Sequence, residues 1–416
     1  MKRARQEKLT RVGPRTPMGE LLRRYWFPVA ASVELPAGAA LKVRLLGEDL
    51  VAFRTSDGAL GLLDERCTHR GTSLACGIVD GHGIACPYHG WRFAPDGRCL
   101  TMPFEARAGA PAAALLARAR TRAHPIEELG GLVFAYLGPQ PAPLLPRYDV
   151  FVWPNALRDI GRALLPCNFL QIMENSVDPV HVEHLHGHHL TAVRARAGLP
   201  APAHYRRRHQ AIGFDRFAHG ILKRRVLEGG SEADEDWRVG HPLVFPTMVR
   251  VGARGQHRLQ IRVPVDDTST LHLWYACYRA PPGRSAPPQT AVPIYDVPWR
   301  DEYGKFITDF VDGGDIMAWV SQGPIADRTR ELLVSSDRGL KVLRRLYLEQ
   351  IQRVKDGHDP LGVVRQPSPD GIIALPQEND KFGGGDAFVR EALALSHCRH
   401  SPILDQIAAL LGPDLP

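Results

Sequence analysis

The spacing of apolar residues divides the chain into a helical start, a strand-rich region and a mixed remainder. In the segment MGELLRRYW apolar residues recur at helical spacing, and Pro28 is expected to end that helix. Between residues 41 and 140, short apolar segments alternate with Asp-Gly and single-glycine turn signals, which predicts β-hairpins. We therefore expect a helical segment over residues 1–40, packed on the C-terminal domain, followed by an all-β domain.

A proline-rich connector, GPQPAPLLPRYDVFVWP, predicts a domain boundary near residue 145. A helical pattern near residues 168–186 follows it, and long helical patterns return at 326–355 and 386–411. Strand-like segments lie between them, at 205–226, 243–251, 257–265 and 270–279. The order helix, sheet, helix predicts an α+β domain. The expected division is 1–40, 41–145 and 146–416.

The charge of the chain changes the expected partners rather than the fold. Lysine and arginine number 52 against 45 aspartate and glutamate, a formal charge of +7. The basic clusters are short and scattered, so we do not expect nucleic-acid binding. The surplus suits an anionic small substrate or an acidic redox partner better. No run of about 18 apolar residues occurs, and no apolar segment follows the basic N-terminus, so a cytoplasmic protein without a membrane span is expected.

Four of the seven cysteines (67, 76, 86 and 99) crowd into one segment that also holds paired histidines. The spacing is Cys67-x-His69 and then Cys86-x-x-His89. Zinc fingers keep like ligands together, whereas each pair here mixes a thiol with an imidazole. A Rieske centre places two cysteines on one iron and two histidines on the other, so each loop supplies one ligand to each iron. The mixed order favours a [2Fe–2S] cluster over zinc.

The residues around these pairs agree with a cluster site. Gly71, Gly77 and Gly90 allow tight loops whose amides can approach cluster sulfurs. Tyr88 and Trp91 are expected to pack over the cluster and exclude water, which tunes its potential. Histidine ligation raises the potential to about −150 to +300 mV, a range suited to passing on one electron.

The segment NFLQIMENSVDPVHVEHLHG carries a second constellation, with Asn175, Asp178, His181 and His186. An undistorted helix would separate two side chains five residues apart by about 140°. A local distortion or a helix end is therefore expected, and Pro179 already perturbs this region. Without a cluster elsewhere in the chain, a polar helix face or a zinc-binding tract would be the alternative interpretation.

Two histidines and one carboxylate form the facial triad of non-haem Fe(II) oxygenases, which leaves coordination positions open for O₂ and substrate. The carboxylate candidates are Asp312, Asp315 and Asp327. We favour Asp315, because it begins a helical pattern directly after Gly313-Gly314 and that glycine pair would let the backbone approach the iron. Asp312 is the next candidate.

Together these motifs resemble the Rieske non-haem iron oxygenases, in particular the phthalate dioxygenase-like group that includes vanillate and dehydrodivanillate O-demethylases. The resemblance covers nearly the whole chain, and it is carried by RTPMGELLRRYWFPVA, the Cys-His segment, ENSVDPVHVEHLH and GDIMAWVSQGPIADRTRE. It implies a Rieske β-sandwich domain followed by a catalytic domain with a helix-grip (START-like) fold, an antiparallel sheet curved around a long helix.

The resemblance also implies roles for single residues. His181, His186 and Asp315 would ligate the mononuclear iron. Asp178 would bridge to His89 across a subunit boundary, and Asn175 matches a position near the iron. It implies a head-to-tail homotrimer, possibly stacked to a hexamer, because the two centres of one family subunit lie too far apart for fast electron transfer.

The implied activity is that of a terminal oxygenase that uses O₂. Electrons would come from NAD(P)H through a separate reductase, since the chain has no glycine-rich dinucleotide fingerprint. Resemblance and basic strands together favour an aromatic carboxylate substrate, which Arg225 or Arg250 could clamp; solvent-facing or interface arginines are the alternative. We expect O-demethylation, with ring cis-dihydroxylation or hydroxylation of a phthalate-like acid as the alternative, and a Rieske electron carrier without catalysis as a different class.

Overall fold

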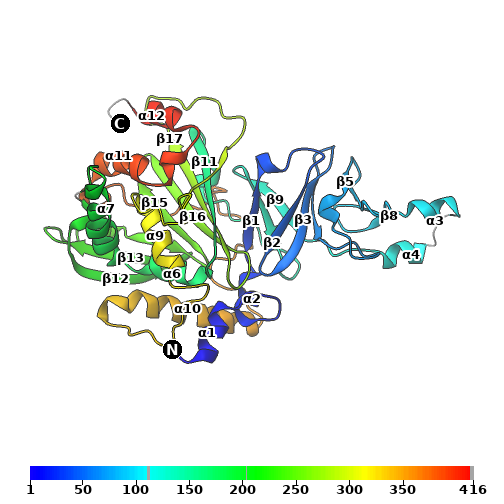
Figure 1. Cartoon of the computed structure of the whole chain (residues 1–416), viewed down its shortest axis with the longest axis horizontal. Helices are drawn as coiled ribbons and strands as arrows, with labels where there is room; N and C mark the ends of the chain where they lie inside the picture. The colour runs from blue at the N-terminus through cyan, green and yellow to red at the C-terminus, as the bar shows by residue number, and fades with distance from the viewer. Residues whose placement is uncertain (110–112, 203, 413–416) are drawn as a thin grey trace.

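The computed structural model describes residues 1–109, 113–202 and 204–412 of the 416-residue chain. Figure 1 shows two parts side by side: a β-rich N-terminal part, and a larger part in which helices cover a broad sheet. No helix among the described residues is both long and apolar enough to cross a membrane.

The N-terminal part consists of three small antiparallel sheets, ordered β1-β10-β9, β2-β3-β4 and β5-β6-β7-β8. Their strands are β1 (Trp26–Ala31), β2 (Ala40–Leu45), β3 (Glu48–Arg54), β4 (Leu60–Asp64), β5 (Ile78–Val79), β6 (Ile84–Ala85), β7 (Arg92–Phe93), β8 (Cys99–Thr101), β9 (Ile126–Leu129) and β10 (Leu132–Tyr136). The predicted β-hairpins are confirmed. Two short helices, α3 (Pro103–Arg107) and α4 (Ala113–Arg118), project from the far end of this part.

The N-terminal segment is helical only in part. It forms α1 (Arg3–Thr10) and α2 (Pro17–Leu22), which lie against α10 (Arg338–Lys355). The predicted helix does not continue to Pro28, because Trp26–Ala31 is strand β1, which pairs with β10. Pro28 is tolerated there since β1 is an edge strand, where a missing N–H breaks no ladder on its outer side. Residues 26–31 therefore belong with the β-rich part.

The larger part is built on an eight-stranded sheet, ordered β12-β13-β14-β15-β16-β17-β11-β18, in which only the β11–β18 pair is parallel. Its strands are β11 (Ala156–Leu165), β12 (His209–Phe217), β13 (Gly220–Leu227), β14 (His241–Val244), β15 (Met248–Ala253), β16 (Gln256–Pro264), β17 (Thr270–Arg279) and β18 (Ile294–Asp296). The sequence did not predict β11, because Arg158, Asp159 and Arg162 interrupt its apolar pattern.

Helices α6 (Phe169–Val177) and α9 (Val311–Val320) lie in front of this sheet (Figure 1). The remaining helices are α5 (Asp149–Val152), α7 (Leu190–Arg196), α8 (Glu235–Arg238), α11 (Gly385–Leu395) and α12 (Leu404–Leu411). The helix predicted over 326–355 begins only at Arg338, since Asp327 caps a turn by accepting a hydrogen bond from the Thr329 N–H at 3.0 Å. The α+β class is confirmed.

Candidate functional site

The two Cys-His loops of the N-terminal part share one backbone design. In each loop the cysteine N–H donates to the carbonyl five residues later, and the glycine four residues later donates back to the cysteine carbonyl, at 2.8–2.9 Å. The glycines are Gly71 (φ +73°) and Gly90 (φ +72°), in the left-handed region that glycine adopts without strain. The loops at Cys67 and Cys86 are therefore two copies of one turn.

The turn buries the sulfurs and exposes the imidazoles. Cys67 and Cys86 are each 3% exposed, whereas His69 and His89 are exposed, with ring centroids 4.5 Å apart. Burial, together with the neighbouring Cys86, raises the pKa of Cys67 to about 11. A pair of buried thiolates needs strong positive charge beside it, which two irons would supply. The donor set fits a Rieske cluster with its histidine edge towards solvent.

The two aromatic residues next to the loops differ in their roles. Trp91 stacks on the His69 ring at 4.4 Å and an interplanar angle of 7°. Tyr88 lies 3.8 Å from the His89 ring centroid but is 55% exposed. Each aromatic ring therefore contacts one histidine of the loops, Trp91 from a half-buried position and Tyr88 from an exposed one.

In the larger part, Asp178 ends helix α6 and begins the next helical segment. Its backbone is extended (ψ 123°), as expected for a residue that precedes proline. Its carboxylate then accepts hydrogen bonds from the N–H groups of Val180 and His181, both at 3.0 Å. The following segment, Val182–His189, is a π-helix. Because a π-helix repeats at i→i+5, His181 and His186 come to one side, and the predicted distortion is confirmed.

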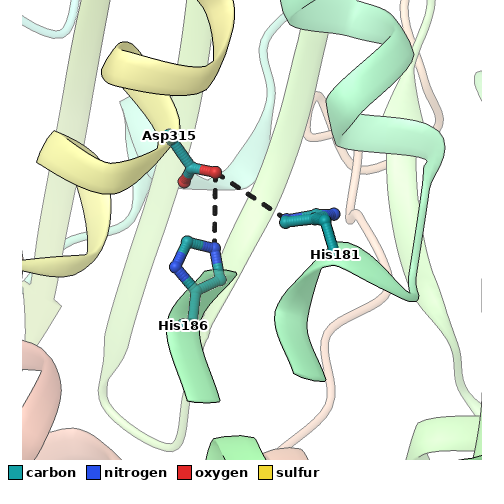
Figure 2. Close-up of side chains that lie close together, drawn as sticks. All are labelled: His181, His186 and Asp315. Atoms are coloured by element: carbon teal, nitrogen blue, oxygen red, sulfur yellow. Dashed lines mark ion pairs between the residues drawn. The ribbon is translucent and has the colours of Figure 1, made fainter. Parts of the chain in front are cut away.

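The structure brings His181, His186 and Asp315 together (Figure 2). Asp315 Oδ1 lies 3.3 Å from His186 Nε2 and 3.7 Å from His181 Nε2, and all three ligand atoms lie within 4.8 Å of one another. Asp315 Oδ1 is buried and has no hydrogen-bond partner among the described residues. A metal ion at about 2 Å from each atom would satisfy it. The donor set fits the 2-His-1-carboxylate triad.

The other two carboxylate candidates are already bonded elsewhere. Asp312 accepts hydrogen bonds from Trp274 Nε1 at 2.8 Å and from the His397 N–H at 2.7 Å. Asp327 Oδ1 accepts from Thr329 Oγ1 at 2.6 Å, away from the histidines.

Asp315 does not begin its helix, contrary to the expectation from the sequence, because helix α9 begins at Val311 and the two glycines lie inside it. A Cβ atom at Gly313 would lie 2.1 Å from the Ile307 carbonyl oxygen, so glycine is required there for packing against that loop. A Cβ atom at Gly314 would meet Leu185 at 3.7 Å, an ordinary contact with the segment that carries the histidines.

Behind the first histidine, the Asp178 carboxylate lies beside the ring nitrogen that faces away from Asp315. Asp178 Oδ2 lies 3.4 Å from His181 Nδ1, so the opposite nitrogen of the ring faces Asp315. Burial raises the pKa of Asp178, but the contacts with His181 outweigh it and leave that pKa below its ordinary value. Lys223 Nζ donates to the backbone oxygens of Ser176 (2.8 Å) and Asp178 (3.2 Å). A carboxylate behind a metal-binding histidine is a common arrangement that fixes tautomer and basicity.

A cavity of about 720 Å³, including its open mouth, adjoins the three residues. Asn175 lines it from α6, and Val249 and Val251 line it from β15. Its cationic lining residues are Lys223, Arg225, Arg258, Arg262 and Lys381.

Of the two arginines proposed as carboxylate clamps, one lines the cavity and one does not. Arg225 lines it, but its guanidinium is paired with Asp236 at 2.7 Å and Glu378 at 3.2 Å. Arg250 lies outside the lining and pairs with Asp149 at 2.7 Å. Its assignment as a clamp is wrong, because side chains alternate along β15 and its neighbours Val249 and Val251 face the cavity.

Sequence reasoning missed the arginines that do face the cavity, Arg258 and Arg262. The segment HRLQIRV alternates polar residues with Leu259 and Ile261. This period of two predicts that both arginines share one face of a strand with Gln260, and all three line the cavity. The signal was present, but it was not distinguished from the other basic strands.

Comparison with known proteins agrees with both sites. The Rieske [2Fe-2S] domain family matches residues 25–119, and the family described as LigXa C-terminal domain like matches residues 303–377. The chain is 39% identical over 372 residues to the 5,5'-dehydrodivanillate O-demethylase oxygenase subunit of Sphingobium sp., covering 89% of this chain and 85% of that protein. It is 29% identical to the phthalate 4,5-dioxygenase oxygenase subunit of Pseudomonas putida, covering 88% and 90%.

The fold is also that of a solved oxygenase. The terminal oxygenase of carbazole 1,9a-dioxygenase from Novosphingobium sp. KA1 superposes with a TM-score of 0.56 at 19% identity, covering 87% of this chain and 96% of that chain. This likeness concerns the fold alone. The motifs, the matched families and the similarity along most of the chain lead to one conclusion: the chain belongs to the Rieske aromatic oxygenases, as an oxygenase alpha subunit with a Rieske [2Fe–2S] domain.

Proposed function

We propose that this oxygenase removes the methyl group of a methoxylated aromatic acid, using O₂ and electrons from a separate reductase. The observation that carries the proposal is the cavity, in which a 2-His-1-carboxylate set adjoins buried cationic side chains. Similarity to a dehydrodivanillate O-demethylase subunit over most of the chain supports the reaction type. The cationic lining supports an acidic substrate.

The proposal assigns Cys67, His69, Cys86 and His89 to the [2Fe–2S] cluster. It assigns His181, His186 and Asp315 to Fe(II). When bound, the cluster supplies single electrons and the iron activates O₂. The chain's own contribution is to orient the ligands, as Asp178 does for His181, and to bring the substrate beside them.

Electron transfer is proposed to run between subunits. The Cys-His loops precede β5 and β7, on the side of the molecule away from α6 and α9 (Figure 1). Asp178 and the two histidines follow α6, and Asp315 lies in α9. Asp178 has a side-chain exposure of 22%, so a neighbouring chain can reach it. We infer that it meets His89 of the partner subunit in a head-to-tail trimer, which closes a ring of identical contacts. A stacked hexamer would keep the same contact.

The electrons are proposed to come from NAD(P)H through a reductase. The exposed edge formed by His69 and His89 would let the reductase, or a neighbouring subunit, come close to the cluster. Reductase and oxygenase would then share the cytoplasm, where NAD(P)H is available.

The proposed reaction is hydroxylation of the methyl group. One oxygen atom of O₂ enters the C–H bond, and two electrons and two protons convert the other to water. The resulting hemiacetal breaks into a phenol and formaldehyde. Ring cis-dihydroxylation or hydroxylation of a phthalate-like acid is the alternative, favoured by the similarity to the phthalate dioxygenase subunit. In that reaction no carbon leaves.

Product analysis tests the proposal. The holoenzyme with a reductase and NADH should release one formaldehyde for each methyl group lost from vanillate or 5,5'-dehydrodivanillate. The alternative, ring dihydroxylation or hydroxylation, would be supported if phthalate gave a dihydroxylated or hydroxylated product. Neither methoxylated acid would then release formaldehyde. A cluster that is reduced and reoxidised without any product would leave only an electron carrier.

A further inference from the structure

Two arginines on β16 line the cavity without an acidic partner. Arg258 and Arg262 are 4% and 1% exposed. Within the part of the chain that the structure describes, Arg258 forms no ion pair or side-chain hydrogen bond, and its Nε is buried and unpartnered. Among the described residues, the Arg262 guanidinium donates only to Gln260, to its backbone oxygen at 3.2 Å and to Oε1 at 2.7 Å, and its Nε is also unpartnered.

Most other buried arginines among the described residues are paired with carboxylates; Arg194 is an exception and donates to the backbone oxygens of Pro200 and Asp309. Arg225 binds Asp236 and Glu378, and Arg250 binds Asp149. Burying a guanidinium without such a partner costs free energy, because the charge loses its hydration. Burial accordingly lowers the pKa of Arg262 to about 9, which still leaves it charged at neutral pH. A loss of stability of this kind is typical of residues that serve a function.

The carboxylates nearest to the pair are occupied. Asp315 and Asp312 attract Arg262 electrostatically, and Asp312 and Asp159 attract Arg258, but none of these carboxylates forms an ion pair with either arginine among the described residues. The oxygens of Asp312 accept from Trp274 and His397. Asp315 faces the two histidines. The charge of the two arginines therefore remains available to a ligand in the cavity.

We propose that Arg258 binds the carboxylate of the aromatic substrate, and that Arg262 adds a second positive charge on the same wall. The proposal rests on the function proposed above, in that the ligand is the acid that enters this cavity. The planar fork of an arginine can hold both oxygens of a carboxylate, which also orients the ring relative to the iron ligands. Arg225, the cavity arginine already paired with two carboxylates, is not part of this subsite.

Equilibrium binding tests the subsite without turnover. Anaerobic calorimetry on the iron-loaded holoenzyme would compare vanillate with vanillyl alcohol, which has the same ring without the charge. The wild type should bind vanillate at least tenfold more tightly than the alcohol. Arg258→Met should weaken vanillate binding roughly 10- to 100-fold and leave the alcohol unchanged. Arg262→Met should cause a smaller loss, and Arg258→Lys should fall between the wild type and Arg258→Met.

Thermal unfolding separates a binding role from a structural one. Arg258→Met removes an unpaired buried charge, so its Tm should equal or exceed that of the wild type. The matched control is Arg250→Met, which leaves Asp149 buried without its cation and should lower Tm. A Tm lowered as much by Arg258→Met as by Arg250→Met would overturn the proposal.

Three binding results would also overturn it: equal affinity of the wild type for acid and alcohol, full vanillate affinity in Arg258→Met, or no binding of either probe. These outcomes differ from a failure of the proposed function. If formaldehyde is released from vanillyl alcohol as readily as from vanillate, O-demethylation stands and the subsite fails. If Arg258→Met loses vanillate binding but the wild type releases no formaldehyde, the subsite stands and O-demethylation fails.

Discussion

Asp178 Oδ2 lies 3.4 Å from His181 Nδ1, on the side of the imidazole ring that faces away from Asp315. The same carboxylate caps the segment that carries the ring, through the N–H groups of Val180 and His181. One side chain thus caps the segment that carries the first histidine and places a negative charge beside that ring. A change at Asp178 should therefore affect catalysis more than folding.

Asp178→Asn is the mildest test of that role. The amide keeps the shape and one acceptor oxygen, so folding, cluster content and mononuclear iron content should stay close to those of the wild type. Loss of the charge behind His181 should lower turnover roughly 10- to 100-fold. Steady-state kinetics with iron analysis would measure both. Unchanged turnover would show that Asp178 neither orients the histidine nor carries electrons.

Electron transfer between subunits can be tested with two inactive variants. His89→Ala should lack a competent cluster and keep the His181–His186–Asp315 site, while Asp315→Ala should keep the cluster and lose the mononuclear iron. Each alone should be inactive. The two variants are then co-expressed with different tags, and oligomers that contain both are purified through both tags. These mixed oligomers should recover part of the wild-type activity, because one chain supplies the cluster and its neighbour supplies the iron. No recovery in mixed oligomers would mean that transfer stays within a chain.

The contribution of Lys223 to the stability of the folded chain depends on pH. It is 3% exposed, and burial, together with the neighbouring Arg225, lowers its pKa to about 7. Between pH 7 and about 10.4 the unfolded chain holds this proton and the folded chain does not. Stability from this group therefore rises with pH across that window. The difference between the Tm of Lys223→Met and the Tm of the wild type should be most positive near pH 6.5 and should fall towards pH 10. A difference that stays constant with pH would contradict the lowered pKa of Lys223.

The glutamate of α6 anchors the C-terminal region. Glu174 is buried and paired with Arg328 at 2.7 Å and Arg344 at 2.6 Å. Glu174→Gln leaves Arg328 without its carboxylate, so the free energy of unfolding should fall by about 3–5 kcal/mol. The control is Glu349→Gln in an exposed pair with Arg345, where about 0–1 kcal/mol is expected. Equal effects in denaturant titrations would refute the anchoring role.

The metal-binding motifs could be predicted from sequence because their chemistry is local. The turns that begin at Cys67 and Cys86 each close within six residues of the chain. The distortion between His181 and His186 follows from helix geometry and from Pro179. Asp315 rather than Asp312 lies next to the histidines, as the sequence predicts, although its helix begins four residues earlier, at Val311. What separates the two residues is Asp312 bonding to Trp274, a contact between distant segments.

Features that depend on distant partners could not be predicted. Strand β11 contains Asp159, which is buried because Ser401 donates to it at 2.5 Å from 242 residues away. Arg250 was indistinguishable from Arg258 until the sheet showed which face each occupies. A period of two assigns residues to faces, but only the packed helices decide which face borders the cavity.

Iron analysis measures whether one chain holds two iron centres. The wild-type chain should bind about three irons, two in the cluster and one at His181, His186 and Asp315. Asp315→Ala should retain two, with the visible absorption of the cluster unchanged and no oxygenation. Two irons in the wild type, or three in an active Asp315→Ala variant, would contradict the account.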